Sequence, residues 1–436
     1  MNCKAILTTA TAGAVLSVFS AVPVPEVTVS GMSQDSKGVA TISYTLSAAD
    51  AVVTLDIETN VTGNVWASIG GAAVSSAQGD VWKKVGIGPH TIEWDGASCW
   101  ADHKIPSGGI RAVVTAWSLD NTPDYMVVDI TATGGADAQR YYPAADFVPG
   151  GVTNSLYKTT TLLMRKIMAK GVMWTMGSIA ESGRNAQRET THQVTLSSNY
   201  YIGVYLVTQA QWQQVTGYNP SRFTTEGMMR PVERVSYVDI RQGKGSAQNA
   251  ASNSGDQYPA DPYGESFLGI LRKTTGLDFD LPSEAQWEFA ARAGNGEGYW
   301  GDGSIIQISS GKDESLNLLG RYLNNPQSNS SAAPDATIAP SEGGTAIVGS
   351  YAENDWGLYD VHGNLQQWCL DRFASDITEL NGTVNTATPE STQRLRRSGN
   401  WHHEARVCRS ANRGGLTPTE RDDGTGLRVV CSAGLQ

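Results

Sequence analysis

Oxygen-bearing side chains gather in one short stretch, residues 354–371, with the sequence NDWGLYDVHGNLQQWCLD. Asp360, Asn364 and Gln367 lie there among aromatic residues and glycines. Carboxylate and amide oxygens can ligate a hard cation such as Ca²⁺, and they can equally accept hydrogen bonds from loop backbone. Two interpretations are therefore open: a calcium-bound loop, or a loop core whose polar groups satisfy their own backbone.

A second group of titratable residues lies near the end of the chain, where His402, His403 and Glu404 are consecutive. Imidazole and carboxylate groups are metal ligands, but adjacent side chains on a strand point to opposite faces. The sequence fixes no third ligand, so we expect two surface histidines here.

The first residues, 1–21, have the pattern of an export signal. Lys4 supplies positive charge, and residues 5–21 form an apolar run of small residues that is too short to span a bilayer comfortably. Cys3 precedes this run, so we expect no lipoprotein anchor. No later stretch is apolar enough to cross a membrane. The sequence predicts an exported protein (periplasmic, cell-surface or secreted) without a transmembrane segment.

Export permits disulfide bonds, and four cysteines follow the signal: Cys99, Cys369, Cys408 and Cys431. Three of them lie in the last part of the chain. We expect one disulfide among Cys369, Cys408 and Cys431, and the pairing stays open.

The length of 436 residues suggests two domains. A hydrophobic content of 40% and a charged content of 17% are typical of a globular protein. The net charge of −11 argues against nucleic acid as a partner, because phosphate binding needs a basic face.

Residues 25–130 are a series of alternating apolar and polar runs rich in β-branched residues, such as GVATISYTL, AVVTLDIET, IRAVVTAWSL and a closing YMVVDI. This pattern predicts an antiparallel β-sandwich that serves as a spacer or docking module. The run at 88–96 resembles the closing hairpin of immunoglobulin-like modules. Residues 131–160 predict an extended linker whose aromatic residues, Tyr141, Tyr142 and Phe147, pack on a neighbouring surface.

Residues 161–436 contain sequence blocks in a characteristic order. The blocks are WTMGS at 174–178, YIGVYLVTQAQW at 201–212, RPVERVSYVDI from 230, LPSEAQWEFAARAG at 281–294, YWG at 299–301 and NDWGLYDVHGNLQQW at 354–368. Two of them read as capped helices: Thr208 is an N-cap, and Ser283 with Gln286 forms a capping box.

Together these blocks resemble the formylglycine-generating enzyme, or sulfatase-modifying factor, family. The resemblance implies that family's variant of the C-type-lectin fold: two helices, a small twisted β-core and much ordered loop. The predicted fold class is therefore α+β, with an immunoglobulin-like β-sandwich followed by this loop-rich domain.

Activity in the family implies a pair of cysteines that bind copper(I), just before an R-x-A-x-R run. Here that region reads RSGNWHHEARVCRSANR, residues 397–413. The matching positions fall near Ala405 and near Trp401–His402, and neither holds a cysteine. Cys408 stands alone and out of register. Copper is therefore not expected, and the chain leans away from being an enzyme.

The resemblance also implies calcium. Asp360, Gly363, Leu365 and Gln367 occupy the positions of one family calcium site, and Gln367 replaces a glutamate, which weakens binding. Asn324 and Asn325 correspond more loosely to a second site.

The tail combines a regular framework with intervening residues, up to Thr425, that share no size or charge and are expected to face outward. The framework residues are Trp401, Cys408, Arg409, Ser410, Ala411, Arg413, Pro418, Arg421, Gly426 and Arg428. This texture is similar to the variable region of target proteins of diversity-generating retroelements, while an ordinary set of exposed loops is the alternative. The expected ligand-binding residues are Trp401, His402, His403, Glu404, Arg406, Asn412, Leu416, Thr417, Thr419, Glu420, Asp422 and Asp423.

The sequence thus predicts an exported protein whose loops 401–425 bind a protein or glycan ligand. The alternative function is a formylglycine-generating oxidase that acts on a peptide cysteine of sulfatases, and a third is a purely structural cell-surface module. The sequence makes no prediction of oligomeric state.

Overall fold

The computed structural model describes residues 23–63, 65–105, 108–132, 135–181, 183–224, 227–242, 261–295, 313–325, 344–374 and 392–435. The predicted signal at 1–21 and the YWG block lie outside these ranges, as do most of the polar inserts around residues 243–260 and 326–343. Within the described ranges, no helix combines the length and the apolar character needed to cross a membrane.

Two antiparallel sheets form the N-terminal part. One sheet contains β1 (Glu26–Gln34), β2 (Val39–Ser47), β7 (Gly88–Asp95) and β5 (Gln78–Gly79). The other contains β4 (Val65–Ser68), β3 (Ala51–Thr62), β6 (Lys83–Val85) and β8 (Ile110–Trp117). Alternate residues of β2, including Ile42 and Tyr44, are buried in the core with residues of β3, as period-two patterning requires. The predicted β-sandwich is present, with two one-turn helices, α1 (Gly71–Val74) and α2 (Gly96–Cys99). Its immunoglobulin-like character stays a prediction.

The segment that we expected to close the sandwich belongs elsewhere. It forms β9 (Tyr125–Asp129), which pairs with β10 (Gln139–Tyr142) and β11 (Thr161–Ile167). With β14 (Tyr200–Gly203) and β19 (Val430–Ser432) they make a 5-stranded sheet of the C-terminal part. The assignment of this strand to the sandwich was wrong because alternation identifies a strand but not its sheet. The 131–160 region is likewise more than a linker, since it contains β10 and the 3₁₀ turns Gly135–Ala138, Ala145–Phe147 and Ser155–Lys158.

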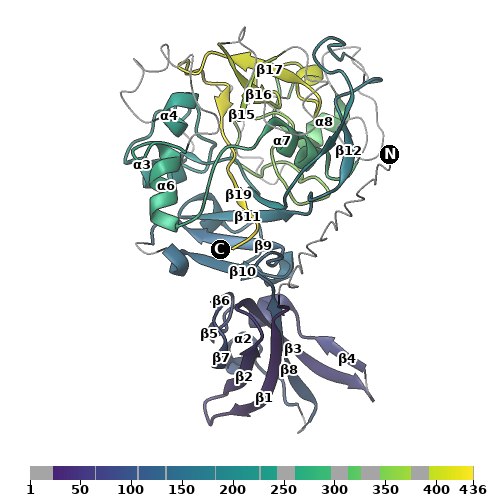
Figure 1. Cartoon of the computed structure of the whole chain (residues 1–436), viewed down its shortest axis with the longest axis vertical. Helices are drawn as coiled ribbons and strands as arrows, with labels where there is room; N and C mark the ends of the chain where they lie inside the picture. Colours follow the sequence, from purple (N-terminus) through teal and green to yellow (C-terminus); the bar gives the residue numbers. More distant parts are fainter. Residues whose placement is uncertain are drawn as a thin grey trace, which may run out of the picture.

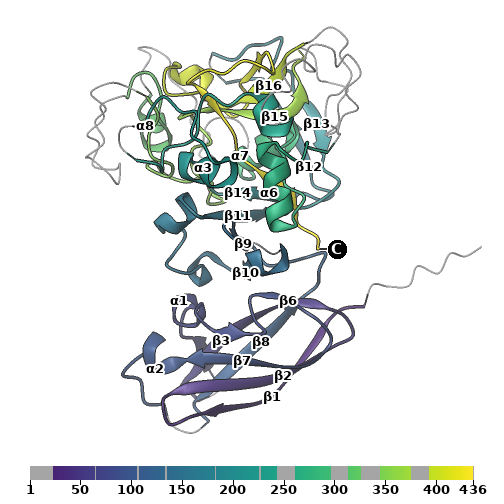
Figure 2. The same cartoon turned by 90° about the vertical axis from the view of Figure 1, so that its left-hand side faces the viewer.

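The sandwich and the C-terminal part share one hydrophobic core. Trp82 contacts the rings of Tyr142 and Phe147 at centroid distances of 5.1 and 6.3 Å. The Tyr141 amide donates a hydrogen bond of 2.8 Å to the Trp82 carbonyl. The expected packing of these aromatic residues on a neighbouring surface is confirmed, and it fixes the sandwich against the 5-stranded sheet (Figure 2).

The helices described in the C-terminal part outnumber the two that the resemblance implied. They are α3 (Gln209–Thr216), α4 (Tyr237–Arg241), α6 (Phe267–Thr275), α7 (Glu284–Arg292) and α8 (Glu314–Leu319). The predicted N-cap at Thr208 and the capping box at Ser283 are both confirmed. Each such cap is worth about 1 kcal/mol.

A 4-stranded sheet carries the tail: β17 (Arg413–Leu416), β16 (Arg394–Arg397), β15 (Gln366–Arg372) and β18 (Thr425–Gly426). A 3₁₀ turn, Ala405–Val407, precedes β17, and the hairpin β12 (Met173–Met176) with β13 (His192–Thr195) completes the described elements. Figure 1 shows β15, β16 and β17 at the end of the long axis opposite the sandwich. The tail is therefore presented at the far end of a continuous body.

Candidate ligand-binding surface

The tail alternates between buried anchors and solvent-facing side chains. Buried positions include Cys408, Arg409, Ser410, Ala411, Arg413, Gly426 and Arg428. None of the residues predicted to bind ligand, from Trp401 to Asp423, is buried. Two details differ from the expectation: Arg421 is exposed, whereas Thr425 is buried. The predicted residues are thus exposed or half-buried, and their role in binding stays a prediction.

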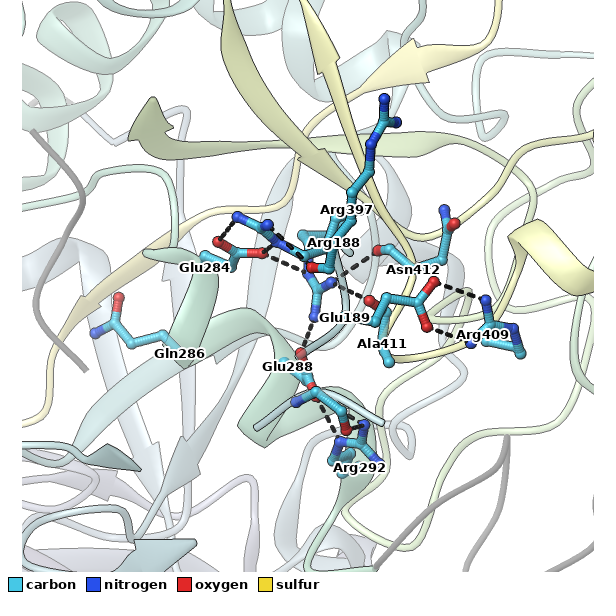
Figure 3. Close-up of polar contacts among 12 residues, drawn as sticks. Arg188, Glu189, Glu284, Gln286, Glu288, Arg292, Arg397, Arg409, Ala411 and Asn412 are labelled. Carbon is cyan, nitrogen blue, oxygen red and sulfur yellow. Dashed lines mark hydrogen bonds and ion pairs between the residues drawn. The ribbon is translucent and has the colours of Figure 1, made fainter. Parts of the chain in front are cut away.

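Helix α7 holds two strands of the tail sheet through buried ion pairs (Figure 3). Glu288 pairs with Arg397 of β16 and, at 2.7 Å, with Arg292 of its own helix. Glu284 pairs with Arg413 of β17 through N–O distances of 2.5 and 2.8 Å. Burial alone raises the pKa of Glu288, but the two guanidinium groups outweigh burial and hold that pKa below its ordinary value.

Arg409 anchors the turn that precedes β17. Its guanidinium donates to Glu181 at 2.6 Å and to both carboxylate oxygens of Glu189, at 2.7 and 2.8 Å (the Glu189 pair is visible in Figure 3). Although burial opposes the charge, the two carboxylates raise the pKa of Arg409 above its ordinary value. The spacing of the tail indicates Arg409 as a framework residue, but nothing in the sequence indicated Glu181 and Glu189 as its partners. For the acids of α7, the sequence offered one signal: Glu284 and Glu288 are spaced i, i+4 and so lie on one helix face.

An aromatic row lies at the surface. The Trp401 indole N–H donates to the Asp423 carbonyl at 2.9 Å, and its ring contacts His402 at 4.7 Å. The two histidine rings lie 5.0 Å apart. The expectation that they diverge was wrong, because it assumed a strand and the residues lie in a turn. Burial lowers the pKa of His403 to about 4, so this ring is neutral near pH 7.

Charges of both signs are interleaved across this surface. Arg406 pairs with Glu404 at 2.7 Å, and Arg421 pairs with Asp239 at 2.6 Å. Among the described residues, no group of three or more His, Cys, Asp and Glu side chains is arranged to hold a metal ion.

The positions that match the family's cysteine pair differ in exposure, since Trp401 is half-buried and His402 is exposed. Ala405 is buried, and Cys408 is fully buried against Gly399, where an added Cβ would lie 2.4 Å from the thiol sulfur. Burial raises the pKa of the Cys408 thiol far above its usual range, so the copper-binding thiolate form is disfavoured.

The expected disulfide is absent, because all four described cysteines are free. Cys431, Cys369 and Cys408 pack in three different hydrophobic clusters, which keeps their sulfur atoms apart. Clustering in sequence was therefore a poor guide to proximity.

The calcium positions are occupied by the protein's own hydrogen bonds. The carboxylate of Asp360 accepts from the Gly349 amide at 2.8 Å and from the Asn364 amide group at 3.1 Å. The Gln367 side-chain oxygen accepts from the Trp287 indole at 2.7 Å and from Arg428 at 3.0 Å. The interpretation as a self-satisfied loop core is the one that these contacts support.

The guanidinium of Arg428 places a positive charge beside the Asp360 and Gln367 side chains. Its buried guanidinium donates to the backbone carbonyls of Gly203 and Val204, at 2.6 and 2.9 Å, and to that of Tyr359. Burial lowers the pKa of Arg428 to about 10, while Asp360 opposes the decrease. Gly363 and Leu365 are buried in the same loop. Because the carboxylate and amide oxygens already have N–H donors, the residues present do not fit a calcium ion.

The second suggested calcium site fits no better. The Asn325 side chain accepts from the Tyr322 amide at 2.8 Å and donates to the Gly320 carbonyl at 2.8 Å. Asn324 is half-buried, and its suggested acidic partner, Asp335, lies outside the described residues.

The fold and the surface define an α+β protein whose loop-rich domain is held by buried arginine–glutamate pairs behind an exposed tail. The chain belongs to the sulfatase-modifying factor family, since residues 158–433 match the model of the "Sulfatase-modifying factor enzyme 1-like domain".

Individual relatives cover different shares of the chain. It is 29% identical to the chaperone protein LppX of Paenibacillus barcinonensis, over 55% of this chain and 82% of that protein. It is 33% identical to the formylglycine-generating enzyme of Streptomyces coelicolor, over 36% of this chain and 47% of the enzyme, so it spans about half of that enzyme's length. Among solved structures, Treponema denticola variable protein 1 aligns with a TM-score of 0.46 and 23% identity, over 63% of this chain and 96% of that protein.

Proposed function

We propose that this protein is an exported binding protein whose loops 401–425 contact a protein ligand. The observation that carries the proposal is the separation of roles within the tail. Within the tail, His402, Glu404, Arg406 and Glu420 are exposed and the other predicted contact residues are partly exposed. Arg409 and Arg413, by contrast, are buried in ion pairs with glutamates from outside the tail. Solvent-facing side chains on a fixed framework are suited to recognition.

A protein ligand suits this surface better than a glycan. Opposite charges are interspersed around Trp401: the ion pair Arg406–Glu404 lies at the surface, and the exposed Arg421 pairs with the buried Asp239. Protein interfaces combine an aromatic centre with such a polar rim. The relative named as a chaperone is compatible with this class of ligand.

Diversification of the tail is part of the proposal, and its test is deep sequencing of the 3′ end of the gene across a population of cells. Substitutions confined to the solvent-facing positions of 401–425, with Arg409 and Arg413 constant, are the expected result. A uniform tail would remove diversification and leave a binding protein of fixed specificity.

Peptide-cysteine oxidation is the competing function. The buried, protonated state of Cys408 and the alanine at position 405 oppose it. Copper-dependent turnover of a cysteine peptide by the purified protein would contradict the proposal that this protein binds a ligand and does not oxidise cysteine.

A further inference from the structure

A loop from far earlier in the chain lies against the tail. Residues 219–224 follow α3, and the Arg222 guanidinium donates to the Asp423 carboxylate at 2.5 Å. The next residue, Phe223, contacts the Trp401 ring edge-on, with centroids 5.3 Å apart and an interplanar angle of 84°. Two side chains of this loop therefore contact the two ends of the predicted binding segment.

These contacts extend the aromatic row of the tail. The Arg222 guanidinium lies over the Phe223 ring at 5.3 Å, Phe223 abuts Trp401, and Trp401 contacts His402. Arg222 remains 57% exposed at its side chain, and Phe223 is half-buried. The row Arg222–Phe223–Trp401–His402 thus reaches solvent as one continuous feature.

Groups outside the tail fix the loop. Glu233 is fully buried, and its Oε1 atom accepts the backbone N–H groups of Arg222 and Phe223 at 2.5 and 3.0 Å. Gly344 packs closely against the Phe223 ring, because a Cβ added at Gly344 would lie 2.7 Å from a ring carbon. The loop therefore keeps its position independently of the variable-looking side chains.

We infer that the recognition surface extends beyond the tail, and that Arg222 and Phe223 are its constant contact residues. The inference rests on the proposed function. Asp423 uses one amino group of Arg222, and the exposed remainder of the guanidinium is suited to a carboxylate. The edge of Phe223 beside it is suited to an apolar side chain. The partner that fits is a folded protein presenting an acidic residue next to an apolar one.

The test is surface display of the full chain with the solvent-facing tail positions randomised, except Trp401 and Asp423, followed by selection on purified ovalbumin, an acidic folded protein. In independently selected binders, Arg222→Ala and Phe223→Ala are each expected to weaken affinity about tenfold, which corresponds to about 1.4 kcal/mol. Arg222→Lys keeps the charge but loses the planar fork, so an intermediate loss is expected.

The matched control is Arg111→Ala. Arg111 is a similarly exposed arginine that stacks on Trp66 at 4.4 Å and pairs with Glu58, but it lies on the sandwich. It is expected to leave affinity unchanged. Unaltered thermal midpoints of the variants exclude misfolding as the cause of lost binding. Binders that tolerate both Arg222→Ala and Phe223→Ala would overturn this inference while leaving the proposed function intact. A library that yields no binders would defeat the proposed function and this inference with it.

Discussion

The buried ion pairs beneath the tail are expected to contribute strongly to the free energy of unfolding, and Glu288→Gln tests this contribution. The Glu288 carboxylate accepts from Arg292 at 2.8 Å, from the Gly177 amide at 2.9 Å and from Arg397. Glutamine keeps the shape and one acceptor oxygen, but it leaves two buried guanidinium groups without their shared counter-charge. Removing one partner of a buried pair costs about 3–5 kcal/mol. This is a large share of the roughly 5–15 kcal/mol by which a domain is stable.

The pH dependence of stability is a second test of the ion pairs made by Glu288. Because the folded-state pKa of Glu288 is held below its ordinary value of 4.5, its contribution to stability is present above that value. The contribution is lost as the pH falls through the lower, folded-state pKa. The difference in unfolding free energy between the wild type and Glu288→Gln is therefore expected to be constant near pH 7 and to shrink as the pH falls below 4.5.

Urea unfolding followed by tryptophan fluorescence measures both effects. The matched control is Glu404→Gln, which removes a carboxylate from an arginine pair whose side chains are 50% and 51% exposed. Solvent screens that pair, so the control is expected to change stability by less than about 1 kcal/mol. A Glu288→Gln protein within 1 kcal/mol of the wild type at pH 7 would refute the view that this pair holds the tail sheet.

Three further outcomes follow from the contacts described above. The guanidinium of Arg428 donates hydrogen bonds within the loop that was expected to bind calcium. Excess CaCl₂ or EDTA is therefore expected to move the thermal midpoint by less than about 1 °C, whereas calcium binding worth about 1 kcal/mol would move it by several degrees. Cys99, Cys369, Cys408 and Cys431 are all expected to be alkylated in urea without reductant, as measured by mass spectrometry, and a protected pair would contradict the free thiols. His403 has a folded-state pKa lowered to about 4 from 6.5, so its neutral form stabilises the protein above pH 6.5 and this contribution is lost as the pH falls towards 4. His403→Gln should flatten the decline of stability across that interval in urea titrations, and an unchanged slope would place the titration elsewhere.

Local spacing was a reliable guide to this molecule where the physics is local. The capping box at Ser283 is a contact between residues three positions apart, and the sequence displays both partners. The buried and exposed alternation of the tail was likewise legible, because a mixture of unrelated side chains cannot share one close-packed core.

Ion-pair partners that are distant in the sequence could not be predicted from it. Arg409 meets Glu189 across 220 residues, and Arg222 meets Asp423 across 201. No periodicity links such positions, so the acids beneath the tail and the loop beside it were missed. The same limit explains the misplaced strand β9 and the expected disulfide, since both depend on which distant segments become neighbours.

The placement of charge inside this domain explains how its surface can be unconstrained. A tail held by apolar packing would need its alternating side chains to match a core in size, whereas Arg397, Arg409 and Arg413 reach inward to acids on α7 and beyond it. These pairs fix the backbone through a few long side chains whose partners lie outside the tail. Exposed positions between them, such as Glu404 and Glu420, are expected to contribute little to stability, because surface substitutions away from such features change it by about 0.5 kcal/mol or less. The anchors therefore separate the requirements of folding from those of the proposed recognition, residue by residue along one short segment.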